Sequence, residues 1–140
     1  MSEIVVGYDG SDSAKAALDQ AIALAKELGD TILIVFGFAP GGYGGGEVPT
    51  QRRAVKELGE KLTGEGAARV AEAGVEHAVE LLNEHGPDAL SDIADRCDAR
   101  MIVVGTKGES PLKGAILAST AHRLLQIANR PVLVVRRESA

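Results

Sequence analysis

Two glycines and two hydroxyl residues in the later part of the chain are of the types, and at the spacing, that are typical of an anion-binding site. Gly105 and Gly108 are separated by two residues, and ten further residues separate Gly108 from Ser119 and Thr120. Glycine lets a ligand approach backbone N–H groups, and the first N–H groups of a helix have no partner within the helix. We expect a helix to open at Ala118, Ser119 and Thr120 and to offer such groups to a phosphate. The same spacing also occurs in ordinary loops.

A second loop with polar chemistry follows the first apolar run of the chain, Ile4 to Val6. Residues 8–13 read Tyr-Asp-Gly-Ser-Asp-Ser and are dense in residues that cap helices. Asp9 could therefore cap the turn, or its carboxylate could contact a ligand. Gly105 likewise ends an apolar run, Met101 to Val104, so both loops are expected at the carboxyl ends of buried strands.

The hydrophobic pattern alternates strands with helices along the whole chain. Strands are predicted at residues 4–6, 32–38, 75–81, 101–105 and 132–135, and helices at 14–28, 51–73, 87–97 and 118–128, the second of them bent or broken near Gly64. This alternation predicts an α/β fold, an open parallel five-stranded sheet with helices on both faces and a Rossmann-like topology. For strand order 3-2-1-4-5, ligands bind between the first and fourth strands, where Asp9 would meet Gly105, Gly108 and Ser119.

Length and composition restrict the class of protein. The 140 residues suit a single domain spanning 1–140, with a core that is aliphatic because 45% of residues are hydrophobic and only 3% aromatic. A net charge of −5 without a run of Lys or Arg argues against nucleic-acid binding. The single cysteine, Cys97, excludes an internal disulfide, and no apolar run or basic leader indicates a membrane or export. We expect a cytoplasmic protein with a small ligand.

Catalytic and metal-binding patterns are not found in the sequence. The residues form no serine, histidine and acid arrangement, and His77, His85 and His122 lack metal-ligand spacing. Cys97 is expected to be a small core residue on a helix face. Residues 39–50 contain five glycines and two prolines, which predicts a mobile loop that could act as a lid.

The chain resembles the universal stress protein family from Ile4 to Arg136. Family members that bind ATP carry Gly, two residues, Gly, nine residues, and then Gly with Ser or Thr. Gly105, Gly108 and Ser119 fit this spacing, whereas Ala118 stands where the family has glycine. Similar segments also occur at residues 6–11 (VGYDGS), 102–108 (IVVGTKG) and 131–136 (PVLVVR).

The resemblance implies an ATP site with Mg²⁺ bound through the phosphates. Asp9 would sit by the adenine and ribose, Gly37 would border the base, Val104 and Gly105 would line the ribose side, and Gly108, Ala118, Ser119 and Thr120 would surround the phosphates. A left-handed backbone at Ala118 would cost about 1–2 kcal/mol, or roughly tenfold in affinity.

The resemblance further implies a stress-response protein that acts as a nucleotide-dependent switch, with slow hydrolysis at most and no true catalytic residue. It also implies a homodimer in which the edge strand Val132–Val135 pairs with its copy. Two alternatives stay open: an interaction protein that has lost nucleotide binding, and an adenylating enzyme of the ATP pyrophosphatase type. The latter rests on a superficial likeness of residues 9–13 to that group's Ser-Gly-Gly-x-Asp-Ser loop.

Overall fold

The strands form one parallel sheet in the order β3-β2-β1-β4-β5. The structure is a computed structural model that describes residues 2–37, 49–82, 86–106 and 114–136. The strands are β1 (Glu3–Gly7), β2 (Thr31–Gly37), β3 (His77–Leu82), β4 (Met101–Gly105) and β5 (Val132–Val135). The predicted fold class and strand order are therefore confirmed.

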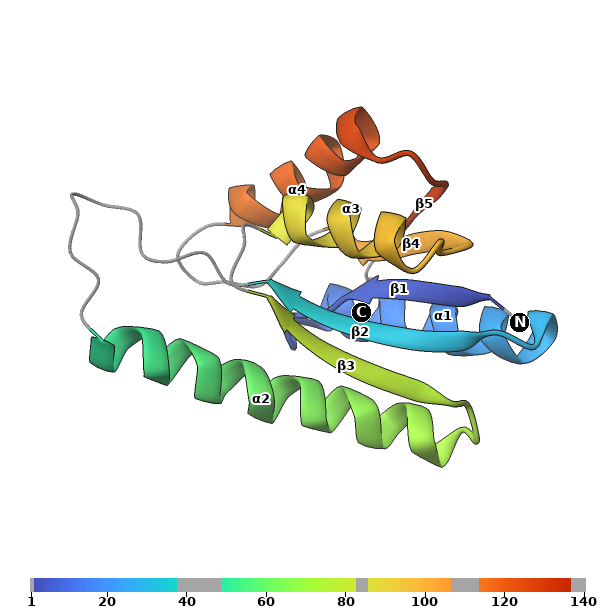
Figure 1. Ribbon diagram of the computed structural model, residues 1–140, viewed down its shortest axis with the longest axis horizontal. Helices are drawn as coiled ribbons and strands as arrows, with labels where there is room; N and C mark the ends of the chain where they lie inside the picture. The colour runs from blue at the N-terminus through green and yellow to red at the C-terminus, as the bar shows by residue number, and fades with distance from the viewer. Residues whose placement is uncertain (1, 38–48, 83–85, 107–113, 137–140) are drawn as a thin grey trace.

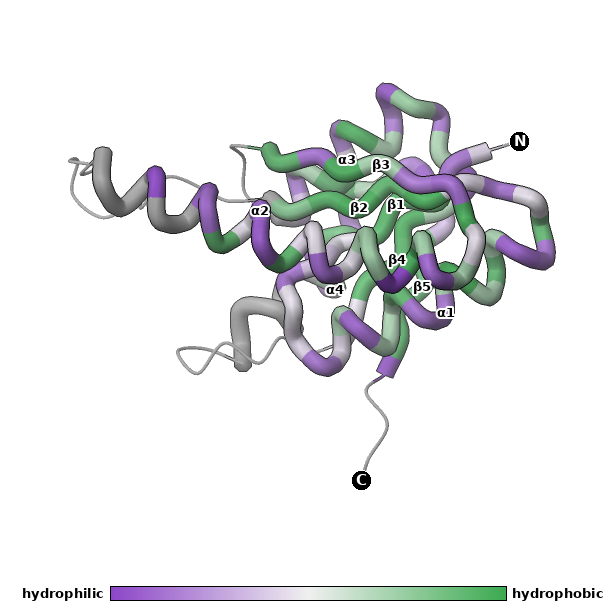
Figure 2. The backbone as a smooth tube through the Cα atoms, turned by 90° about the horizontal axis from the view of Figure 1, so that it is seen from below, coloured by the Kyte–Doolittle hydropathy of each residue, from purple (hydrophilic) through white to green (hydrophobic). Residues whose placement is uncertain are grey.

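Four helices cover the two faces of this sheet (Figure 1): α1 (Asp12–Leu28), α2 (Pro49–Glu72), α3 (Gly86–Arg96) and α4 (Gly114–Ile127). Helices α1 and α2 share one hydrophobic core with one face, and α3 and α4 share a second core with the other. The strands lie between these layers, and the central ones are largely hydrophobic (Figure 2), whereas β3 includes His77 and Glu80. Ile4, Val5 and Val6 of the central strand are fully buried, as the unbroken apolar run predicts for a strand covered on both sides.

Helix α1 begins and ends at the signals expected from its sequence. Ser11 is its N-cap and accepts a hydrogen bond through Oγ from the Ala14 amide at 3.2 Å. Gly29 ends the helix in the left-handed region, at φ 72°, where a residue with a Cβ would be strained. The apolar residues between them face the sheet and bury the helix against β1 and β4.

Helix α2 differs from the prediction in its start and in its continuity. It begins at Pro49 rather than at residue 51, because proline needs no N–H partner in the first helical turn. It then runs as one continuous helix past Gly64 to Glu72, so the predicted break is wrong. Residues 39–48 of the predicted mobile loop, and Phe38 of the predicted second strand, lie outside the described residues.

Helix α4 begins earlier than the sequence suggested. Its first residue is Gly114, not one of Ala118, Ser119 and Thr120. The hydroxyl residues resemble a cap, but Ala115 to Ala118 are good or acceptable helix formers, so the helix extends through them. A smaller difference concerns Cys97, which is half-buried one residue beyond the end of α3 rather than on its face.

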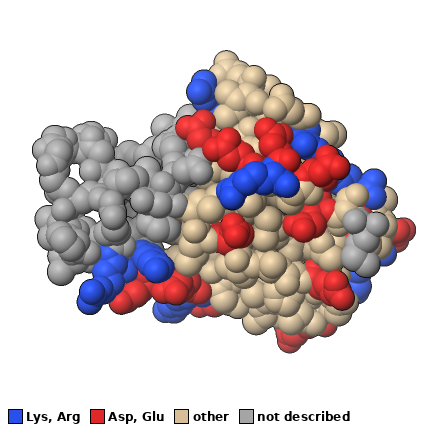
Figure 3. Space-filling model, viewed as in Figure 1, with Lys and Arg blue, Asp and Glu red and all other residues tan. Residues whose placement is uncertain are grey.

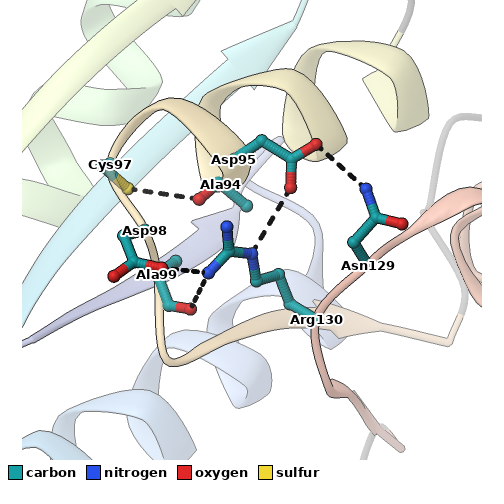
Figure 4. A network of polar contacts seen from close by, with 7 residues as sticks. All are labelled: Ala94, Asp95, Cys97, Asp98, Ala99, Asn129 and Arg130. Carbon is teal, nitrogen blue, oxygen red and sulfur yellow. Dashed lines mark hydrogen bonds and ion pairs between the residues drawn. The ribbon is translucent and has the colours of Figure 1, made fainter.

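Ion pairs join the turns at the end of the sheet where the strands begin, which we call its amino edge. Arg130 precedes β5 and donates through Nη1 to Asp98 at 2.6 Å and to the Ala99 carbonyl at 3.3 Å, while its Nε lies 3.4 Å from Asp95 (Figure 4). Asn129 donates to the second oxygen of Asp95 at 3.2 Å. These contacts fix the α3–β4 turn to the α4–β5 turn, so the edge strand β5 starts from an anchored position.

The surface carries mixed charge. On the face seen in Figure 3, described Asp and Glu side chains alternate with Lys and Arg, without a continuous basic field. In the part of the chain that the structure describes, no helix is both long and apolar enough to span a bilayer.

Candidate functional site

The winding of the sheet reverses between its neighbouring strands β1 and β4. From β1 the chain moves to β2 and β3 on one side, and then returns to β4 and β5 on the other. Val6 of β1 pairs with Val103 of β4, and two residues further along each strand come Tyr8 and Gly105. Ligands in open parallel sheets bind outside the carboxyl ends of such a strand pair, so this edge is the candidate site.

The loop after β1 is held in place by its own hydrogen bonds. The Asp9 carboxylate accepts from the Ser11 amide at 3.0 Å, which closes a short turn in front of α1. Gly10 in this turn has φ 80°, a value that favours glycine. The Tyr8 amide donates to the Val35 carbonyl at 3.0 Å and ties the loop to β2. Asp9 therefore caps the turn, and its half-buried side chain lies at the reversal point as predicted.

Gly105 at the end of β4 is pressed against the first turn of α1. A Cβ built on Gly105 would lie 2.6 Å from both the carbonyl carbon and Oγ of Ser13, and 2.7 Å from its carbonyl oxygen. Real Cβ atoms do not come so close to backbone. This glycine thus allows helix α1 to approach the sheet, a packing role that the G-x-x-G spacing did not reveal.

Helix α2 covers the loop after β1, and sequence reasoning did not anticipate that contact. A methyl group built on Gly10 would lie 2.6 Å from Leu62 Cδ2 of α2. A methyl group built on Gly66 of α2 would lie 3.2 Å from Tyr8 Cε2. One turn earlier on α2, a Cβ on Gly59 would lie 2.5 Å from the Phe36 ring. The only signal in the sequence was the spacing of Gly59, Leu62 and Gly66, which places them on one face of a helix.

Tyr8 lies inside this contact and keeps its proton at neutral pH. Burial is the main cause that raises the pKa of its hydroxyl, and Glu65, Asp9 and Asp19 raise it further. Arg69 of α2 opposes the shift but holds Asp19 in a two-pronged ion pair at 2.6 and 2.8 Å. Tyr8 is thus a neutral hydrogen-bonding group rather than a base.

The other predicted site residues are placed only in part. Gly37 is the last residue of β2, and Val104 precedes Gly105 in β4, so both lie at the carboxyl edge. Gly108 falls outside the described residues. Ala118, Ser119 and Thr120 are the fifth to seventh residues of α4, so their N–H groups lie beyond the unpaired first turn. Because Ala118 is helical, the left-handed cost expected there does not arise.

Other described features do not offer an alternative centre. An open groove of about 590 Å³ runs between α1 and the end of β5, past Lys15, Arg69 and Arg136, and its lining includes neither Asp9 nor Gly105. Among the described residues, no three His, Cys, Asp or Glu side chains converge as a metal site would require.

Comparisons with known proteins agree with this geometry. The sequence matches the Universal stress protein family over residues 1–136. It is 30% identical to Universal stress protein YxiE of Bacillus subtilis, with 96% of this chain and 99% of that protein covered. A universal stress protein of Archaeoglobus fulgidus, solved in complex with dAMP, has TM-score 0.75 and 26% identity over 96% of this chain and 98% of its own.

A second solved universal stress protein, in complex with cAMP, has TM-score 0.72 and 26% identity, with 98% of each chain covered. Sequence and fold therefore lead to one assignment, and this chain belongs to the universal stress protein family.

Proposed function

We propose that this protein binds an adenine nucleotide, with ATP and phosphate-bound Mg²⁺ as the favoured ligand, outside the carboxyl ends of β1 and β4. The observation that carries the proposal is the meeting of the Asp9 loop with the end of β4 at the winding reversal. It gains support from the two related structures, which hold dAMP and cAMP.

The arrangement favours a binding role over a turnover role. Asp9 is engaged in capping the turn through the Ser11 amide, and Tyr8 is buried and protonated, so Tyr8 is not placed to take a proton from water. We therefore propose a nucleotide-dependent switch in a stress response, with hydrolysis slow or absent.

Isothermal titration calorimetry tests this proposal with ATP plus Mg²⁺, AMP and cAMP as separate ligands. We expect saturable binding at micromolar or weaker affinity, and weaker binding by Asp9→Ala. Asp9→Asn is the matched variant, because it keeps an oxygen for the Ser11 amide while removing the charge. Absence of heat with all three ligands at millimolar concentration would contradict the proposal.

One alternative has its own support. An interaction protein without a nucleotide would fit the missing glycine at position 118, since the family's phosphate pattern has glycine there. Mass spectrometry of small molecules released from the freshly purified protein separates the two, because a bound nucleotide would be found only under the first.

A further inference from the structure

Helix α2 contacts the loop after β1, which flanks the candidate nucleotide site, and the end of the neighbouring strand β2. Leu62 reaches Gly10, Gly66 reaches Tyr8, and Gly59 reaches Phe36, which directly precedes Gly37 at the end of β2. The three α2 residues lie on one face of the helix. This face of α2 therefore covers the β1 end of the candidate site.

These contacts leave little free space. Gly66 is buried, and a Cβ there would already be within 3.4 Å of Leu18 as well as close to Tyr8. The residues on both sides of Asp9, Tyr8 and Gly10, are therefore held from above by α2. From below, Tyr8 is hydrogen-bonded to Val35. The hydrogen bond from the Ser11 amide to Asp9 lies within this loop, so it does not by itself fix the loop to the sheet.

We propose that Leu62 is a positioning residue for Asp9, and that through it α2 and the nucleotide site are coupled. This inference rests on the proposed function. Leu62 makes no contact with the nucleotide in this scheme; it keeps the Tyr8–Gly10 loop in the conformation that presents Asp9. By thermodynamic reciprocity, a nucleotide that orders this loop also stabilises α2.

The chain supplies a matched control one turn away. Leu58 lies on the same helix but is 52% exposed, whereas Leu62 is half-buried against the loop. Leu62→Ala should weaken ATP or AMP binding about five- to tenfold at a temperature where the protein is fully folded. Leu58→Ala should leave the affinity unchanged. Leu62→Met conserves the volume of the side chain and should bind the nucleotide as tightly as the unaltered protein.

A double-mutant cycle separates positioning from general loosening. If Leu62 acts through Asp9, the loss caused by Leu62→Ala disappears in an Asp9→Ala background. Equal losses in both backgrounds would overturn the proposal, as would an unchanged affinity of Leu62→Ala or an equal loss in Leu58→Ala.

Amide hydrogen exchange at Ser11 in the free protein gives a readout that needs no ligand. This N–H donates to Asp9, so Leu62→Ala should speed its exchange while Leu58→Ala should not. If the unaltered protein binds no nucleotide, the proposed function fails, and fast Ser11 exchange in Leu62→Ala still supports the positioning of Asp9. Unchanged Ser11 exchange would refute the positioning role.

Discussion

Arg100 and Asp30 form a two-pronged ion pair that joins the starts of β4 and β2. Arg100 Nε lies 2.5 Å from Asp30 Oδ2, and Nη2 lies 3.2 Å from Oδ1, which also accepts from the Ser2 amide at 3.0 Å. The Asp30 side chain is fully buried, while that of Arg100 is 41% exposed. The Arg100 hydrogen bonds are the main cause that lowers the pKa of Asp30, against the opposing effect of burial.

Stability should therefore fall in acid through Asp30. Its pKa is lower in the folded protein than the ordinary 3.8, so its contribution is fully present above that value and is lost as the pH falls through the lower folded pKa. Urea unfolding at pH values from 7 to about 2 should show this loss, and Asp30→Asn should reduce the slope in that window. An unchanged acid slope in Asp30→Asn would refute the assignment.

The glycines of α2 should respond to alanine in opposite directions. Gly64 has no atom within 4 Å of a built Cβ, so Gly64→Ala should raise the free energy of unfolding by about 1 kcal/mol through helix propensity. Gly59→Ala should lower it by about 1–3 kcal/mol, because the methyl group would overlap the Phe36 ring. Chemical denaturation of the two variants measures both, and stabilisation by Gly59→Ala would contradict the close packing of α2.

Gly105→Ala should damage the candidate site and the fold together. The added methyl meets Ser13 backbone atoms that cannot rotate away, so the first turn of α1 must move from the sheet. We expect a loss of about 1–3 kcal/mol in stability and weaker nucleotide binding. Denaturation and calorimetry on one sample test this, with Gly29→Asn as a control, because Gly29 ends α1 and a Cβ there would have no atom within 4 Å. A variant that keeps both properties would show that α1 does not need this approach.

We propose that the protein forms a homodimer through β5. This strand lies at an edge of the sheet, and its four residues, Val132 to Val135, are apolar and only half-buried. Sedimentation at micromolar concentration should give twice 14.5 kDa, and Val134→Lys should give the monomer mass. Val79→Lys is the control, because Val79 is 39% exposed on β3 at the opposite edge. A monomer before substitution, or a dimer that survives Val134→Lys, argues against this interface.

The sequence predicted the sheet well because strand signals are local. The apolar run from Ile4 to Val6, which ends at Gly7, indicates a buried strand whatever the rest of the fold is. The start of α4 was missed because Ser119 and Thr120 resemble caps, and only the whole fold decides which turn begins the helix. The continuity of α2 was missed for a related reason. Glycine costs a helix stability locally, whereas the contacts on either side of Gly64, of Gly59 with Phe36 and of Gly66 with Tyr8, are made with residues distant in sequence.

The role of Gly105 was also beyond local reasoning. Its spacing from Gly108 is typical of a phosphate loop, yet its closest neighbour is Ser13, more than ninety residues earlier in the chain. Asp9, by contrast, could be placed at the site because strand order alone brings the ends of β1 and β4 together.

The Arg130 and Arg100 ion pairs both lie at the amino edge of the sheet, opposite the candidate site. Among the described residues, ion pairs join the turns at the amino rim, whereas the carboxyl rim is held by the close packing of α1 and α2 against glycines. Substitutions in the loop after β1 that keep Gly10 and the contact of Gly105 with Ser13 should therefore leave the ion pairs of Asp30 and Asp98 undisturbed.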